Sequence, residues 1–550
     1  EQKVMDPISF ATRSSRGILP GYAWGSDGKE IFLSQGGKIR KLQLESKKVN
    51  TIPFKAKVKR VISEQAAISF RITDDPFQPK FLRWSSLSPD GSMLTFQAVG
   101  KVWVMELPRG TPRLLIPDNA STTPSRAEFS PAWSPDGNSI AFSTLDDSNQ
   151  GDVWIKALDG GESRKITNQP AFYTHLSWSP KGHEILATRG GGATGRGRTV
   201  GHNAYFDIVQ IPVVGGSAKK LTTISKLIEK GLSNYARRAI PSATYGPDDR
   251  IFFPIPSNEN QKESNESITA FVSVDLDGGN QRTHLTFPQV DIVVPSPSGK
   301  YVAFDQGDNV YVVPFPWRLT GANSVHVSKS DTMLPVSRLT YRGGLYPRWH
   351  DDKILEYGNA NWHYTYDTST GKKDSTHIEF TVPVYRPKGK NVLVGARIIT
   401  MAQSGPQIIE KGKIVTNNGR IECVGKMSDC KTSNADNMIN VEGKTIMPGI
   451  IDMHAHHYRE NRGHRPPNDY EVALYLAYGI TTNLDNSMWA ENIFPTAERI
   501  RAGRMIGPRT FSTGDPIYQG DAPNHNKISN YKDAKDEVLR LKSWGAVAIK

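Results

Sequence analysis

"WSPDGNSIAFS", residues 133–143, combines a Ser-Pro pair, an Asp-Gly pair and an alternating apolar run. Ser-Pro fixes the entry of a tight turn, and Asp-Gly supplies the positive φ that such a turn needs. The alternation that follows is typical of a β-strand with one buried face. This stretch therefore predicts a β-hairpin, and the rest of the chain shows whether the hairpin is repeated.

Similar stretches recur about every 45 to 65 residues, which is within the range of propeller blades with insertions. The seven copies begin at residues 24, 87, 133, 178, 245, 295 and 349. Further strands follow most copies, as in "GDVWIKALDGGESRKIT" (151–167) and "AFVSVDLDGGNQRTHLT" (270–286), which gives four strands per unit. Four-stranded units in series predict an all-β propeller of about seven blades.

The middle strands of these units stand as "KVWVMEL" (101–107), "DVWIKAL" (152–158) and "NVYVVPF" (309–315). With the S-P-D-G turn and the Gly-Gly endings, they make the region from about 19 to 385 similar to the TolB-like β-propellers. The resemblance implies a propeller domain over residues 1–388. Propellers mostly bind, and the fold alone names no chemistry. The basic, Gly-rich insertion "TRGGGATGRGRTVGHNAYFD" (188–207) is a candidate functional loop, with a plain surface loop as the alternative.

Beyond the repeats the pattern changes twice. Short β segments joined by turns such as Asn418-Gly419 predict a small β-sandwich over residues 389–447. Strands then alternate with helices, and this predicts parallel strands and the first half of a (β/α)8 TIM-type barrel over 448–550. We expect strands at 449–456, 480–487, 508–514 and 546–550, and helices at 468–479, 495–503 and 532–544. Because eight strands close such a barrel, we expect the chain to be cut at Lys550.

Two details of this region are predicted from local signals. Asn468 is a suitable N-cap for the first helix, with Glu471 completing a capping box. The second helix is expected to start at Pro495, because proline is favoured in the first turn.

The strand at 449–456 carries the candidate functional residues. Side-chain alternation places Asp452, His454 and His456 on one face, and the C-terminal end of a barrel strand is where active sites lie. Two neutral imidazoles so arranged can bind one metal ion. By the same alternation, Lys550 points into the barrel at the end of the fourth strand. His457 and His464 are expected in loops, where contact with substrate is the lesser alternative.

"GKTIMPGIIDMHAH" (443–456), preceded by a small sheet, resembles the amidohydrolase superfamily, especially its imidazolonepropionase-like and prolidase-like branch. The resemblance implies that His454 and His456 bind a catalytic divalent metal, most simply one or two zinc ions. It implies that Lys550 is carboxylated and bridges two metals. Asp452, which precedes both histidines on their strand, is a candidate to orient one of them as a hydrogen-bond partner. In this family further histidines follow strands 5 and 6, and an Asp follows strand 8.

The implied activity is hydrolysis of amide, lactam or dipeptide-like carbon–nitrogen bonds by a metal-activated hydroxide. The substrate would be a small molecule or short peptide, and the propeller would be an accessory binding or gating domain. This chain alone is expected to be inactive. The alternative is a non-catalytic binding or scaffold protein whose propeller recognises a peptide, glycan or protein partner. A third hypothesis, a secreted binder of an anionic polymer, fits the net charge of +13.

Composition limits the partners and the location. Lys and Arg are scattered rather than clustered, so we do not expect nucleic-acid binding. No run of eighteen apolar residues occurs, so no membrane span is expected. Cys423 and Cys430 provide neither a disulfide framework nor a cysteine-zinc site, and they do not decide the redox compartment. The expected location is periplasmic or secreted, and association into a homo-oligomer is compatible with the sequence.

Overall fold

The computed structural model divides the chain into two units, Glu1–Thr73 and Asp74–Lys550. It describes all residues except 1–21, 36–37, 58, 60–71, 119–125, 148–149, 191–204, 226, 229–230, 233–239, 258–267, 289, 319–323, 330–333, 406, 458–463 and 519–527. Most of the Gly-rich insertion at 188–207 therefore lies outside the described residues. The described part of the first unit is an antiparallel sheet around the first repeat, made by β1 (Tyr22–Trp24), β2 (Glu30–Gln35), β3 (Lys38–Gln43) and β4 (Val49–Ile52).

The other six repeats each form a sheet in the second unit. The first three sheets contain β5 (Arg83–Leu87), β6 (Met93–Ala98), β7 (Lys101–Glu106) and β8 (Arg113–Leu114); β9 (Arg126–Trp133), β10 (Ser139–Asp146), β11 (Val153–Ala157) and β12 (Arg164–Lys165); and β13 (Phe172–Trp178), β14 (Glu184–Gly190), β15 (Tyr205–Pro212) and β16 (Lys219–Ser225). A two-stranded ribbon of β17 (Leu227–Ile228) and β18 (Gly231–Leu232) follows.

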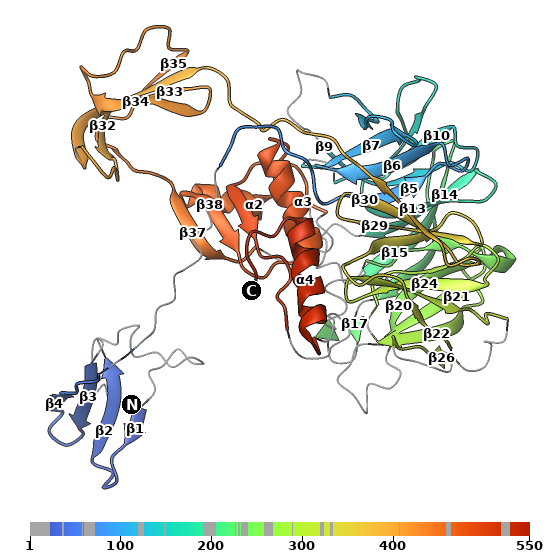
Figure 1. Ribbon diagram of the computed structural model, residues 1–550, viewed down its shortest axis with the longest axis horizontal. Coiled ribbons are helices and arrows are strands. Elements are labelled where there is room, and N and C mark those ends of the chain that lie inside the picture. Colours follow the sequence, from blue (N-terminus) through green and yellow to red (C-terminus); the bar gives the residue numbers. More distant parts are fainter. Residues whose placement is uncertain are drawn as a thin grey trace. The chain divides into compact units, whose positions relative to one another are not determined.

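The next three sheets complete the series. They contain β19 (Thr244–Tyr245), β20 (Ile251–Ser257), β21 (Ile268–Val274), β22 (Arg282–Pro288) and β26 (Val325–His326); β23 (Val293–Pro295), β24 (Tyr301–Gln306), β25 (Asn309–Pro314) and β27 (Ser337–Arg338); and β28 (Leu345–Trp349), β29 (Ile354–Asn359), β30 (Trp362–Asp367) and β31 (Lys373–His377). A 3-10 turn at Pro247–Asp249 links β19 and β20. Four-stranded antiparallel units, as predicted, thus dominate the unit (Figure 1).

These six sheets form a closed ring. Going round the ring, β5 contacts β9, β9 contacts β13, β13 contacts β19, β20 contacts β23, β23 contacts β28, and β28 contacts β5 again. A bridge between Phe77 and Val382 joins the two ends of the ring. Among the described residues the ring therefore closes with six sheets, and the prediction of about seven blades had counted the repeat at residue 24, which lies in the other unit.

The repeated turn explains how neighbouring sheets are joined. In the copy at 133–143, Ser134 O accepts from Gly137 N at 2.9 Å, and Gly137 has φ of 74°, which glycine adopts without strain. The tryptophan before the turn donates its indole N–H to the innermost strand of the preceding sheet. The pairs are Trp133 to Ser86 O, Trp178 to Ala132 O and Trp349 to Val294 O, at 3.0, 3.0 and 3.1 Å. The repeat thus specifies both a hairpin and a contact between sheets.

Residues 390–446 form one mixed sheet rather than the two sheets of the predicted sandwich. Its strands are β32 (Lys390–Ile399), β33 (Ile408–Asn417), β34 (Arg420–Lys426), β35 (Asn437–Asn440) and β36 (Thr445–Ile446). One sheet suffices because the long, bulged β32 pairs with β35 along its first half and with β36 near its end.

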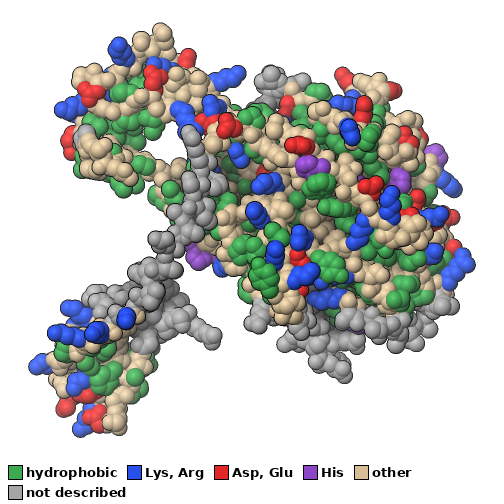
Figure 2. Space-filling view, in the orientation of Figure 1, with side chains coloured by type: hydrophobic (Ala, Val, Ile, Leu, Met, Phe, Trp, Pro, Cys, Tyr) green, Lys and Arg blue, Asp and Glu red, His purple; other side chains and the backbone are tan. Residues whose placement is uncertain are grey.

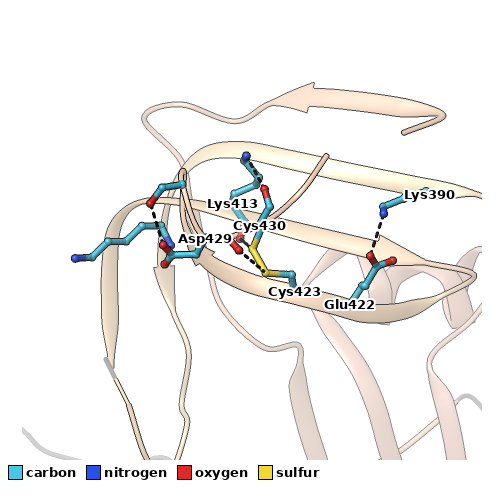
Figure 3. The surroundings of a disulfide bond; sticks show 8 residues. Lys390, Lys413, Glu422, Cys423, Asp429 and Cys430 are labelled. Carbon is cyan, nitrogen blue, oxygen red and sulfur yellow. Dashed lines mark hydrogen bonds and ion pairs between the residues drawn. A yellow bond between two sulfur atoms is a disulfide. The ribbon is translucent and has the colours of Figure 1, made fainter. Parts of the chain in front are cut away.

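A disulfide that the sequence did not predict lies in this sheet. Cys423 of β34 is bonded to Cys430, with their Cα atoms 5.8 Å apart (Figure 3). The buried Lys413 ammonium donates to Cys430 O at 3.0 Å. The bond closes a short loop, so it stabilises local structure rather than holding distant segments together.

The last segment, 450–544, alternates strands and helices. Its elements are β37 (Ile450–Ala455), α2 (Tyr470–Ala477), β38 (Ile480–Asp485), α3 (Ala490–Arg501), β39 (Arg509–Ser512) and α4 (Tyr531–Trp544). The strands are parallel in the order β37-β38-β39. Parallel pairing and the alternation agree with the prediction, whereas a half-barrel of four strands is not seen among the described residues.

Two local predictions in this segment are wrong. The N-cap of α2 is Asp469, whose carboxylate accepts from Glu471 N and Val472 N, whereas Asn468 donates to Asp147 of the propeller. Helix α3 starts at Ala490, five residues before Pro495, so the proline lies inside the helix and beyond the first turn, where its missing N–H removes one intrahelical hydrogen bond.

Helices α3 and α4 pack directly on the propeller (Figure 1). Phe494 of α3 and Trp544 of α4 lie 6.2 and 5.4 Å from the ring of Phe81, measured between centroids. Arg540 of α4 is 3% exposed and pairs with Asp308 of the propeller at 3.1 Å. The propeller and the α/β segment therefore share one hydrophobic core.

Candidate functional site

The predicted histidine pair lies at the C-terminal end of β37. The ring centroids of His454 and His456 are 5.1 Å apart, with 62° between the ring planes. Both side chains are exposed, whereas Ala455 between them is 2% exposed. The alternation of the strand therefore presents the two imidazoles together on an accessible surface.

Asp485, which sequence reasoning missed, lies beside the pair. It ends β38, the neighbouring parallel strand, and it is fully buried. Its carboxylate accepts from the backbone N–H of His457 at 2.7 Å and from Ser487 N at 3.1 Å, and it lies 3.9 Å from His456 Nδ1. Burial alone would raise the pKa of Asp485, but the hydrogen bonds from His457 outweigh burial and lower it. Its place at the end of a parallel strand was the signal that could have found it.

His457 lies just after β37 and outside any strand, as expected, and its side chain is a buried partner of Asp485. It is 4% exposed, and its Nδ1 lies 3.0 Å from Asp485 Oδ2. Its ring lies 4.8 Å from the ring of Tyr475 on α2, and Asn483 Nδ2 is 3.3 Å from Nε2. The His457–Asp485 pair thus ties the end of β37 to the end of β38, next to the exposed histidines.

His464 lies inside the propeller. It is 1% exposed, and its Nε2 is 3.0 Å from Thr174 Oγ1. Its ring packs against Trp84, Phe129 and Phe172 at 5.3, 4.8 and 5.1 Å. His464 lies outside the helices and strands, as expected, but its buried side chain anchors the segment that follows β37 to three sheets of the propeller.

The remaining predicted site residues are arranged differently from the expectation. Asp452 Oδ1 accepts from the backbone N–H of His454 at 3.0 Å, so its contact is with the main chain of the candidate ligand. Residues 546–550 form no strand, which contradicts the predicted fourth strand. Ala546 N donates to Leu541 O at the end of α4, and the bonds from Val547 N to Ser512 O and from Ile517 N to Lys550 O are isolated, so they do not make a ladder. The Lys550 side chain is exposed.

The donor types fit a divalent metal, but their number falls short in the described part of the chain. Two adjacent imidazoles are suitable zinc ligands. Within the described ranges, no group of three or more His, Cys, Asp and Glu side chains lies close enough to hold an ion. His454 and His456 would therefore hold a metal only together with ligands of another kind or from elsewhere.

The surface and the helices limit other functions. Figure 2 shows Lys and Arg side chains interspersed with Asp and Glu over the propeller face in view, without a large patch of one sign. Among the helices that the structure describes, none is long and apolar enough to cross a membrane.

Comparison with known proteins gives short similarities. No family model matches the chain. It is 25% identical to the uncharacterized peptidase YuxL of Bacillus subtilis (strain 168) over 130 residues, which are 24% of this chain and 19% of YuxL. It is 38% identical to the imidazolonepropionase of Rhizorhabdus wittichii over 61 residues, 11% of this chain and 15% of that enzyme. The solved structure of TolB from Acinetobacter baumannii is 12% identical, with a TM-score of 0.28 over 73% of this chain and 77% of that one.

The chain thus spans a fifth or less of the length of these two curated relatives. Parts of it are similar to hydrolases, and its second unit contains a β-propeller. These statements describe the class of protein only at a coarse level.

Proposed function

We propose that this chain is part of a metal-dependent hydrolase of carbon–nitrogen bonds, with the propeller as an accessory binding or gating domain. The observation that carries the proposal is the exposed pair His454 and His456 at the C-terminal end of a parallel strand, beside the buried Asp485. The similarity to an imidazolonepropionase supports the same reaction class. Amides, lactams and dipeptide-like molecules are the substrates that fit.

The chain's own residues would position the metal ligands. His454 and His456 would hold the ion, most simply zinc, through neutral imidazole nitrogens. Asp452 holds the backbone of His454, and the His457–Asp485 pair holds the backbone directly after His456. When bound, a divalent ion lowers the pKa of a water ligand towards 7 and polarises a carbonyl group. That Lys550 is a carboxylated bridge between two ions stays a prediction.

The disulfide supports a periplasmic or secreted location. The Cys423–Cys430 bond needs an oxidising compartment to persist, because cytosolic thiols are kept reduced. Free-thiol titration of protein isolated from its native source, with and without a reductant, tests this part of the proposal.

Metal content tests the site. We expect one or two divalent ions per folded chain by plasma mass spectrometry after reconstitution with zinc, and their loss in a His454→Ala/His456→Ala variant. A His183→Ala/His377→Ala variant is the matched control, because both histidines are exposed and lie on the propeller. Unchanged zinc in the His454/His456 variant would contradict the assignment of the ligands.

The rival function is a non-catalytic binding protein. The shortage of a third ligand among the described residues favours it. A folded chain that binds no zinc after reconstitution would contradict the hydrolase and support the rival.

A further inference from the structure

The propeller encloses a central cavity of about 530 Å³. Trp84, Ser130, His175, Thr244, Val294 and Tyr346 line it, one from each of the six sheets. This volume is in the range of small-molecule sites, which measure roughly 300–1,000 Å³.

The α/β segment contacts two residues of the cavity wall. Trp84 lines the cavity and packs against His464, which belongs to the segment between β37 and α2. Tyr346 also lines the cavity, and its hydroxyl donates to Glu491 in the first turn of α3 at 2.8 Å. The segments that follow β37 and β38 thus contact two of the side chains that line the cavity.

The repeated turns also contribute to the cavity wall. Pro89, Pro135 and Pro180 of three S-P turns are among the lining residues. A ligand that fills the cavity would therefore contact the turns as well as Trp84 and Tyr346.

The walls combine flat aromatic surfaces with one fixed positive charge. Trp133, Trp178 and Trp349 contribute indole surface. Arg348 is the only Lys or Arg among the described lining residues, and no Asp or Glu is among them. Glu356, which lies near Arg348, is already engaged by Leu87 N at 2.9 Å and by His350 Nδ1 at 3.1 Å. Glu356 lies opposite Arg348 on β29 and the two charges interact, but Arg348 makes no ion pair with a carboxylate among the described residues.

Unsatisfied polar atoms point to the same place. Ser242 Oγ and Thr244 Oγ1 belong to lining residues, are buried, and have no hydrogen-bond partner among the described residues. Buried polar atoms are nearly always hydrogen-bonded, so such a pair in a cavity wall is typical of a binding site.

We propose that the cavity binds a small carboxylate-bearing molecule with an aromatic or apolar body. The carboxylate pairs with Arg348, and the body lies against the tryptophans. An arginine and a carboxylate form charge-assisted, often bidentate hydrogen bonds, which gives the site its selectivity. This site is distinct from the histidine pair, and binding there needs no metal.

Isothermal titration calorimetry on the metal-free full chain tests the proposal. The probes are 3-phenylpropionate and indole-3-propionate, and 3-phenyl-1-propanol is the uncharged control for the first of them. None of the three contains a bond that a hydrolase could cleave. We expect saturable binding of at least one acid, with one site per chain and an affinity about tenfold or more above that of the alcohol. Arg348→Gln should lower the affinity for the acid to that for the alcohol, whereas Arg348→Lys, which keeps the charge but not the bidentate hydrogen bonds, should retain only part of the difference.

Arg113→Gln is the matched control, because Arg113 lies exposed on β8. It should bind the acids like the unaltered chain. Circular dichroism confirms that each variant is folded, and if Arg348→Gln does not fold, the comparison of acid with alcohol on the unaltered chain decides. Absence of saturable binding by both acids, equal affinity for acid and alcohol, or unchanged binding in folded Arg348→Gln would overturn the proposal.

Discussion

The propeller ring and the α/β segment bury their apolar side chains in different ways. In the ring every sheet lies between two others, and Leu94, Phe142 and Val302 have no exposed surface. In the α/β segment Ile451 and Met453 of β37 are 60% and 63% exposed, and the buried side chains of α3 and α4 lie against the propeller. A closed ring provides its own core, whereas an open three-stranded sheet takes part of its core from its neighbour.

This difference has a consequence for the candidate site. The histidine pair lies on the open sheet, so the position of its loops depends on contacts with the propeller. His464 and Glu491, in the segments that follow β37 and β38, make those contacts. Changes at the shared core should therefore affect the α/β segment first and leave the ring intact.

Arg540→Met should have the largest effect. The guanidinium pairs with Asp308 at 3.1 Å, Glu537 at 2.8 Å and Asp515 at 3.4 Å. Burial lowers the pKa of Arg540, but the three carboxylates outweigh burial and raise it. Removing the cation takes away the positive charge shared by three largely buried carboxylates, so the free energy of unfolding of the α/β segment should fall by about 3–5 kcal/mol. Hydrogen exchange should accelerate in α4 and not in β10, whereas the exposed Arg113→Met should change neither. Equal acceleration in both elements would contradict the separation of the two regions.

Glu498→Gln should have the next largest effect, through pH. Burial raises the pKa of Glu498 to about 7. The backbone N–H of Lys80 donates to its carboxylate at 2.6 Å and opposes this rise only in part. Because the folded state holds the proton more tightly than the unfolded state, stability is highest below about pH 4.5 and falls as pH rises to about 7. The total fall is on the order of 3 kcal/mol.

Glutamine resembles the protonated acid, so the variant should lose this pH dependence and be the more stable protein at pH 8. Urea unfolding at pH 5 and pH 8 measures both quantities, with the exposed Glu162→Gln as control. A pH dependence that persists in Glu498→Gln would assign it to other groups.

Much of the ring could be predicted because its information is local. The turn at 133–143 requires Asp-Gly and the strand requires alternation, and both features lie within eleven residues. The closure of the ring with six sheets could not be predicted. The sequence of the repeat at residue 24 resembles the others, and only contacts between sheets decide whether a repeat belongs to the ring. The one mixed sheet at 390–446 was missed for a similar reason, since a single long strand serves two partners.

The candidate site could be predicted only in part. The alternation of β37 predicted the neighbouring rings of His454 and His456. It did not predict Asp485 or the burial of His464, because their partners lie far away in the sequence. The prediction of a strand at 546–550 was wrong, because alternating side chains are typical of a strand but do not provide the neighbouring strand with which it must pair.

Trp133→Phe and Trp84→Phe should have the smallest effects on the free energy of unfolding. Comparing them isolates the hydrogen bond that joins two neighbouring sheets. Both indoles lie in the ring, but Trp133 Nε1 donates to Ser86 O at 3.0 Å, whereas Trp84 Nε1 has no hydrogen-bond partner among the described residues. Phenylalanine keeps most of the apolar contact and removes the donor, so Trp133→Phe should cost about 1 kcal/mol more than Trp84→Phe. Urea unfolding of the ring measures the difference. Equal costs would mean that the indole bond between sheets contributes nothing and that packing alone holds neighbouring sheets together.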